Sequence, residues 1–318
     1  MQEGFFNSPG LCCHYVYFLL CSMNQPVLIL LPHNIQLSVK REDLLHPYIS
    51  GNKFRKLKYN ILQAKAEGKT ALLTFGGAFS NHIAATAAAG KEYGFATIGI
   101  IRGEELEGKI NENPTLGFAA QCGMRLKFIS RGAYRDKTAV DFIEALRKEF
   151  GDFYLLPEGG TNAMAVQGCE EILDGGDSAF THICCAVGTG GTIAGIINSA
   201  GQGQKVLGFP ALKSAGLSDD ICKFAQNGNW ELVNEYHFGG YGKADEQLIA
   251  FINNFFEATG IPLDPVYTGK LFFGVIDMIN NGGFPENARI LLIHTGGLQG
   301  IAGMNRELAR KKRPLIKT

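Results

Sequence analysis

Two kinds of hydrophobic pattern alternate along most of the chain. Short apolar runs of strand type are separated by longer stretches in which apolar residues recur every three or four positions, as on one face of a helix. The runs that predict strands are Ala71–Phe75, Thr97–Ile101, Leu126–Ile129, Phe153–Leu156, His182–Val187, Val206–Phe209 and Ile290–His294. This alternation predicts βαβ units with parallel sheets flanked by helices, which is the α/β class.

The stretches between these runs predict helices. They are Asn81–Tyr93, Asn113–Cys122, Asp136–Phe150, Ala163–Leu173, Gly191–Ala200, Asp245–Thr259 and Lys270–Asn280. A further helix is predicted after Lys53, because apolar residues follow it at helical spacing and residues 50–52 (Ser-Gly-Asn) supply turn and cap residues. No repeat, low-complexity segment or long linker marks a domain boundary.

Composition narrows the function classes. The chain has 318 residues, 46% of them hydrophobic and 19% charged, which suits a soluble protein with one large or two smaller lobes. Its formal net charge is zero. We therefore expect no nucleic-acid partner, and we interpret the short basic tail after Arg310 as a solvated terminus.

The eight cysteines do not predict a disulfide framework. Cys184 and Cys185 fall inside a predicted buried strand, and no Cys or His set has the spacing of zinc ligands, so no metal site is predicted. We expect buried, reduced cysteines and a cytoplasmic protein.

Residues 1–23 contain an apolar stretch, LCCHYVYFLLC, of about half the length that crosses a membrane. The residues before it lack the positive charge of a secretory signal, which leaves a signal or lipoprotein role as the weaker alternative. We expect an extension of unknown role outside the core, no membrane partner, and a globular pattern that begins just afterwards.

Lys53 stands at the predicted start of its helix, the positive end of the helix dipole. A lysine held there is shifted toward its neutral amine, the form that attacks carbonyl groups and makes Schiff bases. The alternative is a solvated lysine on a basic face with Arg55, Lys56 and Lys58, and this segment alone leaves that alternative open.

A glycine-rich loop in CCAVGTGGTIAGII predicts a phosphate site. It lies between a strand ending at Val187 and a helix, and consists of Gly188, Thr189, Gly190, Gly191 and Thr192. Glycines let backbone amides approach an anion closely, and threonine hydroxyls at a helix start add donors. The loop lacks the lysine of a Walker loop and the GxGxxG spacing of dinucleotide sites.

Two further loops follow predicted strands. In LLTFGGAFSNHIAATAAAG, Ser80 is placed to cap a helix that begins at Asn81, and the alternatives are a plain cap or a substrate site in which Ser80 or His82 relays a proton. In ILLIHTGGLQGIAG, the strand delivers Thr295 to the sheet edge where α/β proteins bind ligands. His294 is interpreted as a satisfied strand-end histidine and is left out of the site.

Six ordered motifs together carry a family resemblance: VKREDLLHPYISGNKFRKL, FGGAFSNH, PEGGTN, VGTGGT, DPVYTGK and HTGG. The chain resembles the pyridoxal-phosphate enzymes of the tryptophan-synthase β-like fold (fold type II). More narrowly, it is similar to the 1-aminocyclopropane-1-carboxylate deaminase/D-cysteine desulfhydrase family. The resemblance covers about residue 25 to the C-terminus.

The resemblance implies a role for each matching position. Lys53 would be the Schiff-base lysine and the base at the substrate's α-carbon, and residues 188–192 would hold the phosphate of pyridoxal 5'-phosphate. Asn81 would bond the cofactor's phenolic oxygen, and Ser80 and His82 would lie against the substrate carboxylate. With Lys53, Ser80 and Tyr267 would be the catalytic residues.

Three more positions complete the implied site. Tyr241 matches a second active-site tyrosine, with a packed ring as the alternative, and Thr295 would contact the pyridine nitrogen. Thr268 stands beside the substrate where ring-opening deaminases carry glutamate, and Thr295 stands where they carry leucine. A hydroxyl there promotes protonation of the pyridine less than a carboxylate does, which favours elimination of a good leaving group over ring opening.

The expected enzyme is therefore a carbon–sulfur lyase or deaminase of D-cysteine desulfhydrase type. It would convert a small amino acid to a 2-oxo acid and ammonia, with sulfide released from cysteine. The alternatives are 1-aminocyclopropane-1-carboxylate deamination and a non-catalytic protein that binds a phosphate ligand. The resemblance implies two lobes, a large one of residues 24–53 and 161–318 and a small one of residues 54–160, and a homodimer is expected.

Overall fold

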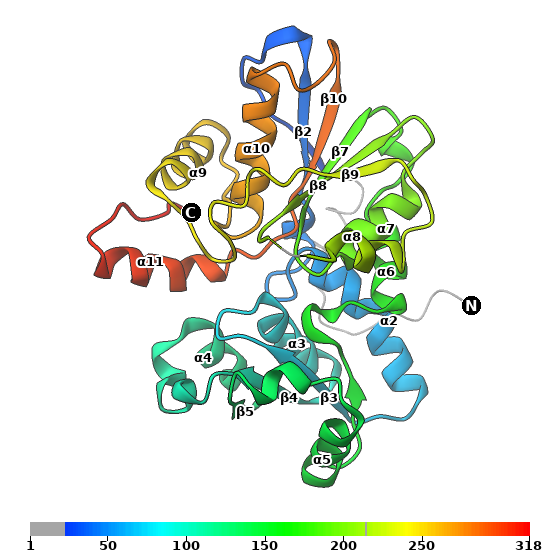
Figure 1. The fold of residues 1–318 in the computed structure, drawn as a ribbon, viewed down its shortest axis with the longest axis vertical. Helices are drawn as coiled ribbons and strands as arrows, with labels where there is room; N and C mark the ends of the chain where they lie inside the picture. Colours follow the sequence, from blue (N-terminus) through cyan, green and yellow to red (C-terminus); the bar gives the residue numbers. More distant parts are fainter. Residues whose placement is uncertain (1–22, 214) are drawn as a thin grey trace.

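The computed structural model describes residues 23–213 and 215–318, which form two lobes with one sheet each (Figure 1). The larger sheet has strand order β1-β2-β10-β7-β8-β9 and is parallel except for β1, which runs antiparallel to β2. Its strands are β1 (Asn24–Pro26), β2 (Gln36–Lys40), β7 (His182–Val187), β8 (Lys205–Pro210), β9 (Trp230–Leu232) and β10 (Arg289–Ile293). The smaller sheet is wholly parallel, in the order β5-β4-β3-β6. Its strands are β3 (Ala71–Gly76), β4 (Ala96–Arg102), β5 (Arg125–Ile129) and β6 (Tyr154–Leu155).

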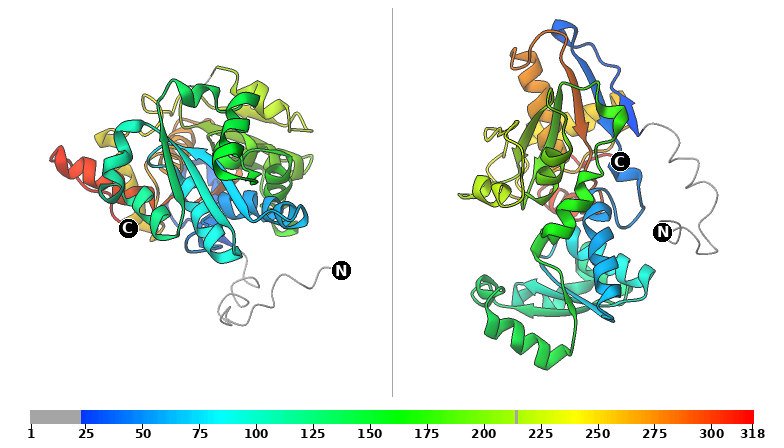
Figure 2. Two further views of the ribbon diagram at one scale, coloured as in Figure 1. Left: turned by 90° about the horizontal axis from the view of Figure 1, so that it is seen from below. Right: turned by 90° about the vertical axis from the view of Figure 1, so that its right-hand side faces the viewer.

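Helices flank both sheets. They are α2 (Asn52–Ala66), α3 (Asn81–Tyr93), α4 (Pro114–Gln121), α5 (Val140–Phe150), α6 (Ala163–Glu170), α7 (Gly191–Ser199), α8 (Leu217–Cys222), α9 (Glu246–Thr259), α10 (Thr268–Asn280) and α11 (Gly300–Arg310). The two lobes lie end to end, and α2 and α6 run between them (Figures 1 and 2). The α/β class predicted from the pattern is confirmed.

All seven predicted strands are present, and the differences lie at short or polar elements. Helix α5 begins at Val140, after a separate 3-10 turn at Ala133–Asp136, rather than at Asp136. The pattern missed β1 and β9, which have three residues each, and β2, whose sequence QLSVK ends on a lysine. It also missed α8 and α11. A lone short strand carries too little periodicity to be recognised.

The large sheet is covered on both faces. In β10, Ile290 and Leu292 join the apolar cluster formed with α9 and α10, whereas Leu291 and Ile293 join the cluster formed with α7. All four side chains are fully buried. Because successive strand residues point to opposite faces, a run that is apolar at every position fits a strand between two helix layers.

The small sheet is built in the same way. Leu72 packs toward α2 and α3, and its neighbour Leu73 packs toward α5 on the other face. Burial of each such side chain contributes about 1.5–3 kcal/mol to the free energy of unfolding. The predicted domain limits at residues 53/54 and 160/161 remain a prediction, although the sheet-forming strands divide in that way.

Helix α2 belongs to both lobes. Leu57 and Ile61 lie in the apolar cluster of the small lobe, while the backbone of Arg55 contacts α6. A Cβ on Gly168 of α6 would lie 2.0 Å from the Arg55 carbonyl oxygen, so only glycine permits this crossing. This close contact between the two backbones fixes the position of α2 relative to α6.

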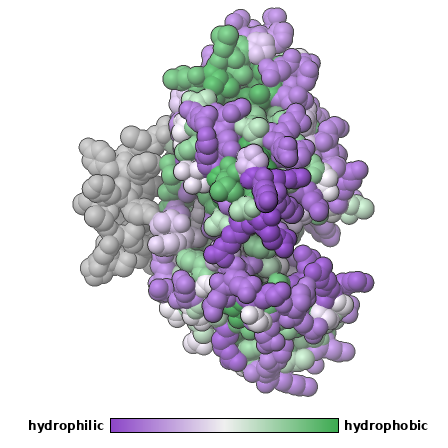
Figure 3. Space-filling model, turned by 90° about the vertical axis from the view of Figure 1, so that its left-hand side faces the viewer, coloured by the Kyte–Doolittle hydropathy of each residue, from purple (hydrophilic) through white to green (hydrophobic). Residues whose placement is uncertain are grey.

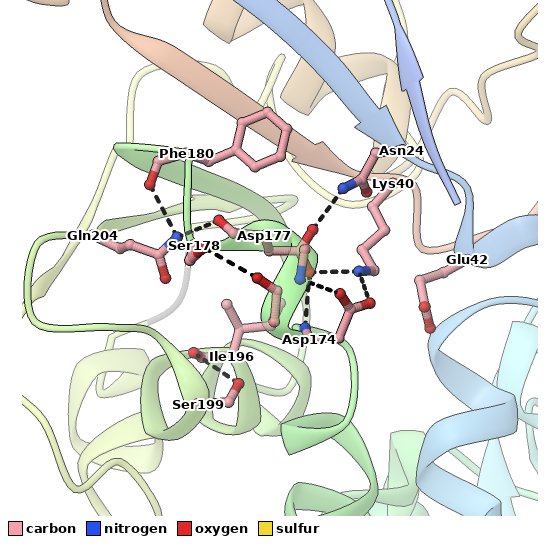
Figure 4. Close-up of polar contacts among 12 residues, drawn as sticks. Asn24, Lys40, Glu42, Asp174, Asp177, Ser178, Phe180, Ile196, Ser199 and Gln204 are labelled. Atoms are coloured by element: carbon pink, nitrogen blue, oxygen red, sulfur yellow. Dashed lines mark hydrogen bonds and ion pairs between the residues drawn. The ribbon is translucent and has the colours of Figure 1, made fainter. Parts of the chain in front are cut away.

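A partly buried ionic cluster holds the end of β2, as Figure 4 shows. The Lys40 ammonium donates to Asp174 Oδ2 at 2.8 Å and to Asp177 Oδ2 at 2.5 Å. Asn24 Nδ2 donates to the other oxygen of Asp177 at 2.7 Å. Lys40 and Asp177 are buried and Asp174 is exposed, and the two buried charges are tolerated because they pair with each other and are hydrogen-bonded. The cluster therefore joins β1 and β2 to the turn that precedes β7.

A second buried ion pair lies just beyond this cluster. The Glu42 carboxylate is fully buried and accepts two hydrogen bonds from the Arg55 guanidinium, at 2.8 and 2.9 Å. This bidentate geometry is the most directional form of ion pair. The Lys40 cluster thus holds the start of the segment that leads from β2 into α2, and the Glu42–Arg55 pair joins this segment to α2 itself.

The surface is largely hydrophilic on the face drawn in Figure 3, with hydrophobic side chains gathered at the end of the large lobe. Leu28 and Leu30, between β1 and β2, are strongly exposed. In the part of the chain that the structure describes, no helix is both long and apolar enough to cross a membrane. The predicted extension over residues 1–23 lies outside the described residues except for Met23.

Candidate active site

The start of α2 lies at the centre of the candidate site. Gly51 is the N-cap and Lys53 lies in the first turn, which contains no acidic residue. Lys53 Nζ donates to the carbonyl oxygen of Gly159 at 3.3 Å. Lys56 Nζ donates to the same oxygen at 3.1 Å and to Thr161 Oγ1 at 3.0 Å. Two lysines thus point to one side of the helix, against the PEGGT loop.

Both lysines are biased toward the neutral amine. Burial lowers the pKa of Lys53 well below its usual value, and the neighbouring Lys56 lowers it further. Burial also lowers the pKa of Lys56. Because only the neutral amine is nucleophilic, Lys53 has the character expected of a residue that attacks a carbonyl group.

The alternative of a solvated basic face does not describe this helix. Lys56 is only 2% exposed. Arg55 pairs with Glu42, and Lys58 Nζ pairs with Glu171 at 2.7 Å. The four basic residues in the first half of α2 therefore divide into two that form structural ion pairs and two whose amines point toward the site.

The glycine loop at residues 188–192 lies beside these amines. Asn52 Nδ2 donates to Thr192 Oγ1 at 2.8 Å, and the hydroxyls of Thr161 and Thr189 are 2.6 Å apart. Helix α7 begins at Gly191, and its N-cap, Gly190, has φ +82° and offers no side-chain cap. The first amides of α7 therefore have no side-chain acceptor at the cap, as in a helix start that binds an anion.

The unpaired ring nitrogens of His82 also indicate a ligand site. It is 2% exposed, and neither ring nitrogen has a hydrogen-bond partner within the described part of the chain. A Cβ on Gly160 would lie 2.7 Å from its Cε1 atom, so the PEGGT loop covers the ring. Burial, with Lys53 and Lys56, lowers the pKa of His82 well below its usual value. A neutral imidazole without partners is costly unless a bound group satisfies it.

The start of α3 completes this side of the site. Ser80 is the N-cap, and its Oγ accepts from the Ile83 amide at 3.3 Å. Asn81 Oδ1 accepts from Gln299 Nε2 at 2.8 Å. Gly297 has φ +93°, and a Cβ on this residue would lie only 2.6 Å from Asn81 Nδ2. The SNH and HTGG loops, which come from different lobes, therefore meet at Asn81.

Thr268 lies in the turn that starts α10. Its side chain is fully buried, and its hydroxyl donates to Asp264 Oδ1 at 2.8 Å while accepting from the Asp264 amide at 2.8 Å. Asp264 also accepts from the amides of Val266 and Tyr267. Thr268 thus fixes the turn that starts α10, because its hydroxyl has both a donor and an acceptor partner already.

Tyr267 and Tyr241 lie together at the edge of the site. A Cβ on Gly188 would lie 3.1 Å from the Tyr267 hydroxyl, so this ring reaches the glycine loop. The two tyrosine rings meet edge to face with centroids 6.0 Å apart. Burial raises the pKa of Tyr267 well above its usual value, and Tyr241 adds to the effect. Tyr241 remains 46% exposed, so it lies on the outer side of the pair.

The loop that carries Tyr241 is anchored by a buried lysine. Lys270 Nζ donates to the carbonyl oxygens of Ala211, His237 and Gly240, at 3.1, 2.9 and 2.8 Å. Burial lowers the pKa of Lys270 to about 8. Three acceptors around one ammonium hold the loop close to the start of α10.

His294 has the structural role expected of it. Its Nε2 donates to the Pro262 carbonyl at 2.7 Å, and its Nδ1 accepts from the Gly296 amide at 3.2 Å. The carbonyl oxygen of Thr295 accepts from the Asn52 amide at 3.3 Å. The HTGG loop is therefore tied to the helix that carries Lys53.

Replacing Gly51 with alanine is expected to lower the free energy of unfolding by about 2–4 kcal/mol. Gly51 has φ +61°, and a Cβ there would lie 2.0 Å from the Thr295 carbonyl oxygen. Equilibrium unfolding in urea measures the loss. Gly68→Ala is the matched control, because Gly68 has φ +66° with nothing near its Cβ position. Equal losses in the two variants would show that the contact with Thr295 is unimportant.

The residues that sequence reasoning missed are Lys56, Thr161, Asp264 and Lys270. Each belongs to one of the six motifs, but its role depends on a partner distant in the chain or on a turn. Lys56 had a usable signal, because a spacing of three residues places it on the same side of a helix as Lys53. Lys270 gave no such signal, since its three acceptors come from two other loops.

The residues present fit pyridoxal phosphate. A glycine loop at a helix start, with Thr189 and Thr192, suits a phosphate group, and Lys56 beside it supplies a cationic donor when protonated. Lys53 supplies the amine that such a cofactor requires, and His82 leaves two polar atoms for a ligand to satisfy. These features meet in one place, between the two lobes.

Comparisons with known proteins agree with this chemistry. A bifunctional D-cysteine desulfhydrase/1-aminocyclopropane-1-carboxylate deaminase, mitochondrial, from Arabidopsis thaliana is 31% identical, over 85% of this chain and 74% of the relative. A D-cysteine desulfhydrase from Yersinia pestis is 29% identical, over 82% of this chain and 86% of the relative.

A solved structure also has a similar fold. The crystal structure of an ACC deaminase homologue matches with a TM-score of 0.76 and 26% identity, covering 94% of this chain and 99% of that one. The family described as "Pyridoxal-phosphate dependent enzyme" matches residues 28–296. The chain therefore belongs to the family of pyridoxal-phosphate dependent enzymes and has their two-lobed α/β fold of type II.

Proposed function

We propose that the protein eliminates a leaving group from Cβ of a small amino acid, as a D-cysteine desulfhydrase does, and releases a 2-oxo acid and ammonia. Cysteine would also yield sulfide. The observation that carries the proposal is Lys53, an amine of lowered pKa where the loops of both lobes converge. The names of the relatives from Arabidopsis thaliana and Yersinia pestis support the same reaction.

Different residues of the chain bind the cofactor and remove the α-proton. Bound pyridoxal phosphate supplies an electron sink that makes the substrate's α-proton acidic. Lys53 Nζ takes that proton, since it is the nucleophilic amine at the centre of the site. Residues 188–192 and Lys56 hold the phosphate, and Asn81 lies beside the Gly297 backbone where it can bond the ring oxygen.

The substrate is oriented from the small lobe. The first turn of α3 presents Ser80 and backbone amides to a carboxylate, and His82 adds a neutral donor and acceptor. Tyr267 covers the opposite side at Gly188. This arrangement holds the Cα–H bond close to Lys53, which is the main requirement for proton removal.

Ring opening of 1-aminocyclopropane-1-carboxylate remains the second candidate, because the Arabidopsis relative carries that name as well. The absence of glutamate at position 268 favours elimination. Thr268→Glu is expected to lower the free energy of unfolding by about 2–4 kcal/mol, since it places a second carboxylate against buried Asp264. Urea unfolding measures this, with Thr268→Ser as the control that keeps the hydroxyl. A variant as stable as the parent would show that position 268 has room for the carboxylate of a deaminase.

A substrate panel tests the reaction. The holoenzyme is incubated with D-cysteine, L-cysteine, β-chloro-D-alanine, D-serine and 1-aminocyclopropane-1-carboxylate, and 2-oxo acid release is measured. Borohydride treatment should also attach the cofactor covalently to Lys53, as peptide mass spectrometry would show. Covalent attachment without turnover of any substrate would contradict the proposed reaction. A phosphate ligand bound without attachment would favour the non-catalytic alternative.

We further infer a homodimer and a cytoplasmic location. The family fold and the exposed apolar residues Leu28 and Leu30 support self-association. The five described cysteines are free, which supports a reducing compartment. Light scattering of the purified protein tests the first inference, and cell fractionation tests the second.

A further inference from the structure

Arg102 lies at the edge of the small sheet from which the substrate loop emerges. It is the last residue of β4, and the register pairs Gly76 of β3 with Ile101, so Arg102 stands beside Gly77. Its Nη2 atom lies 3.5 Å from where a Cβ on Gly77 would be. The carboxyl edge of a parallel sheet is where α/β proteins bind ligands.

The Arg102 side chain is oriented by an aromatic ring. Its guanidinium carbon lies 5.5 Å from the centroid of the Tyr134 ring, within cation–π range. Tyr134 is itself buried, and its hydroxyl donates to Glu158 Oε1 at 2.8 Å. Tyr134 therefore contacts Arg102 through its ring and Glu158 through its hydroxyl.

The charge of Arg102 is not compensated, whereas that of its acidic neighbour is. Glu158 Oε2 pairs with Lys137 Nζ at 3.2 Å. Arg102 has no ion pair with any residue in the ranges 23–213 and 215–318, and its side chain is exposed. An exposed cation without a carboxylate at a ligand-binding edge is available to an anionic group.

Arg102 lies within electrostatic range of Tyr241 in the large lobe. Its positive charge lowers the pKa of the Tyr241 hydroxyl, against the larger opposing effect of burial. Tyr241 in turn contacts Tyr267, which reaches the glycine loop.

The spacing suits a substrate with two acidic groups. The Ser80 amide donates to the Gly77 carbonyl at 3.1 Å, so residues 77–80 form a turn. The ends of such a turn lie within about 7 Å of each other. A carboxylate at the start of α3 therefore lies one small side chain away from the space beside Arg102.

We propose that Arg102 binds a second acidic group on the substrate, and that the enzyme prefers amino acids whose side chain carries an anionic group at Cβ or beyond. This proposal rests on the proposed function. The guanidinium would form paired, charge-assisted hydrogen bonds to a phosphate or carboxylate, which a side chain without an anionic group cannot match. Arg102 thereby selects the substrate without touching the α-carbon.

Comparison of neutral and anionic substrates tests the proposal. The kcat/KM for 2-oxo acid release is measured with β-chloroalanine and with O-phosphoserine, which would release phosphate, each as both enantiomers. Arg102→Met should lower kcat/KM for the anionic substrates by about 10–100-fold, mainly through KM, and change that for β-chloroalanine by less than about twofold. The matched control is Arg131→Met, because Arg131 is 75% exposed and its charge is already paired with Glu105.

A binding measurement separates this proposal from the proposed reaction. Titration calorimetry compares succinate with propionate on the holoenzyme, and succinate should bind more tightly to the parent but not to Arg102→Met. Equal loss for neutral and anionic substrates, or unchanged succinate binding, would overturn the role of Arg102. If no substrate is turned over but succinate binding still depends on Arg102, the reaction is wrong and the anion site stands.

Discussion

Replacement of Lys53 with alanine should lower 2-oxo acid release by about a thousandfold or more, because one change removes both the amine that attaches the cofactor and the base at Cα. The phosphate cradle at residues 188–192 does not depend on this side chain. The variant should therefore still bind pyridoxal phosphate, but release it on dialysis. Steady-state kinetics and the retained cofactor measure the two effects.

The control for this variant is Lys65→Ala, in the last turn of the same helix, where the side chain is exposed. It should keep full activity. Circular dichroism of both variants verifies the fold. Substantial turnover by Lys53→Ala in a correctly folded sample would show that another amine, with Lys56 the first to examine, performs the chemistry.

Replacement of Lys56 with methionine should weaken cofactor binding by about 10–100-fold, since a donor to the phosphate region is lost from a buried position. It should also raise the pKa of Lys53, because the neighbouring positive charge that lowers it is removed. Covalent capture of the cofactor by the apoprotein requires neutral Lys53. Its pH midpoint should therefore move to higher pH in the variant.

Lys58→Met is the matched control for Lys56, because Lys58 lies on the same helix but pairs with Glu171 and not with the PEGGT loop. Cofactor affinity is followed by fluorescence titration, and capture by borohydride trapping over a pH series. An unchanged affinity together with an unchanged midpoint would remove Lys56 from the phosphate site and leave it a structural partner of Thr161.

The sequence predicted the framework of this molecule better than its polar interior. Strand β7 and helix α3 agree with their predicted limits residue by residue, because each has a long apolar pattern and a clear start. Lys53 was located by the helix that follows it. Strand β2 was missed because its last residue is a lysine, and burial of Lys40 requires aspartates more than 130 positions away.

The candidate site shows the same limit. Ser80 and the loop at residues 188–192 carry local signals, because caps and glycine turns depend on neighbours in the chain. Thr268 was interpreted by its place in a motif, but its partner is Asp264, four residues earlier, in a turn that the motif does not describe. Arg102 gave no signal, because only the pairing of β3 with β4 brings it beside the substrate loop.

Helix α2 links the two lobes and carries the reacting amine. Its first turn is bonded to the large lobe through Thr192 and Thr295, while Leu57 and Ile61 belong to the core of the small lobe. Lys53 therefore lies where the two lobes are joined. The position of the amine therefore depends on bonds to one lobe and on packing in the other, and a variant that loosens either contact should displace it.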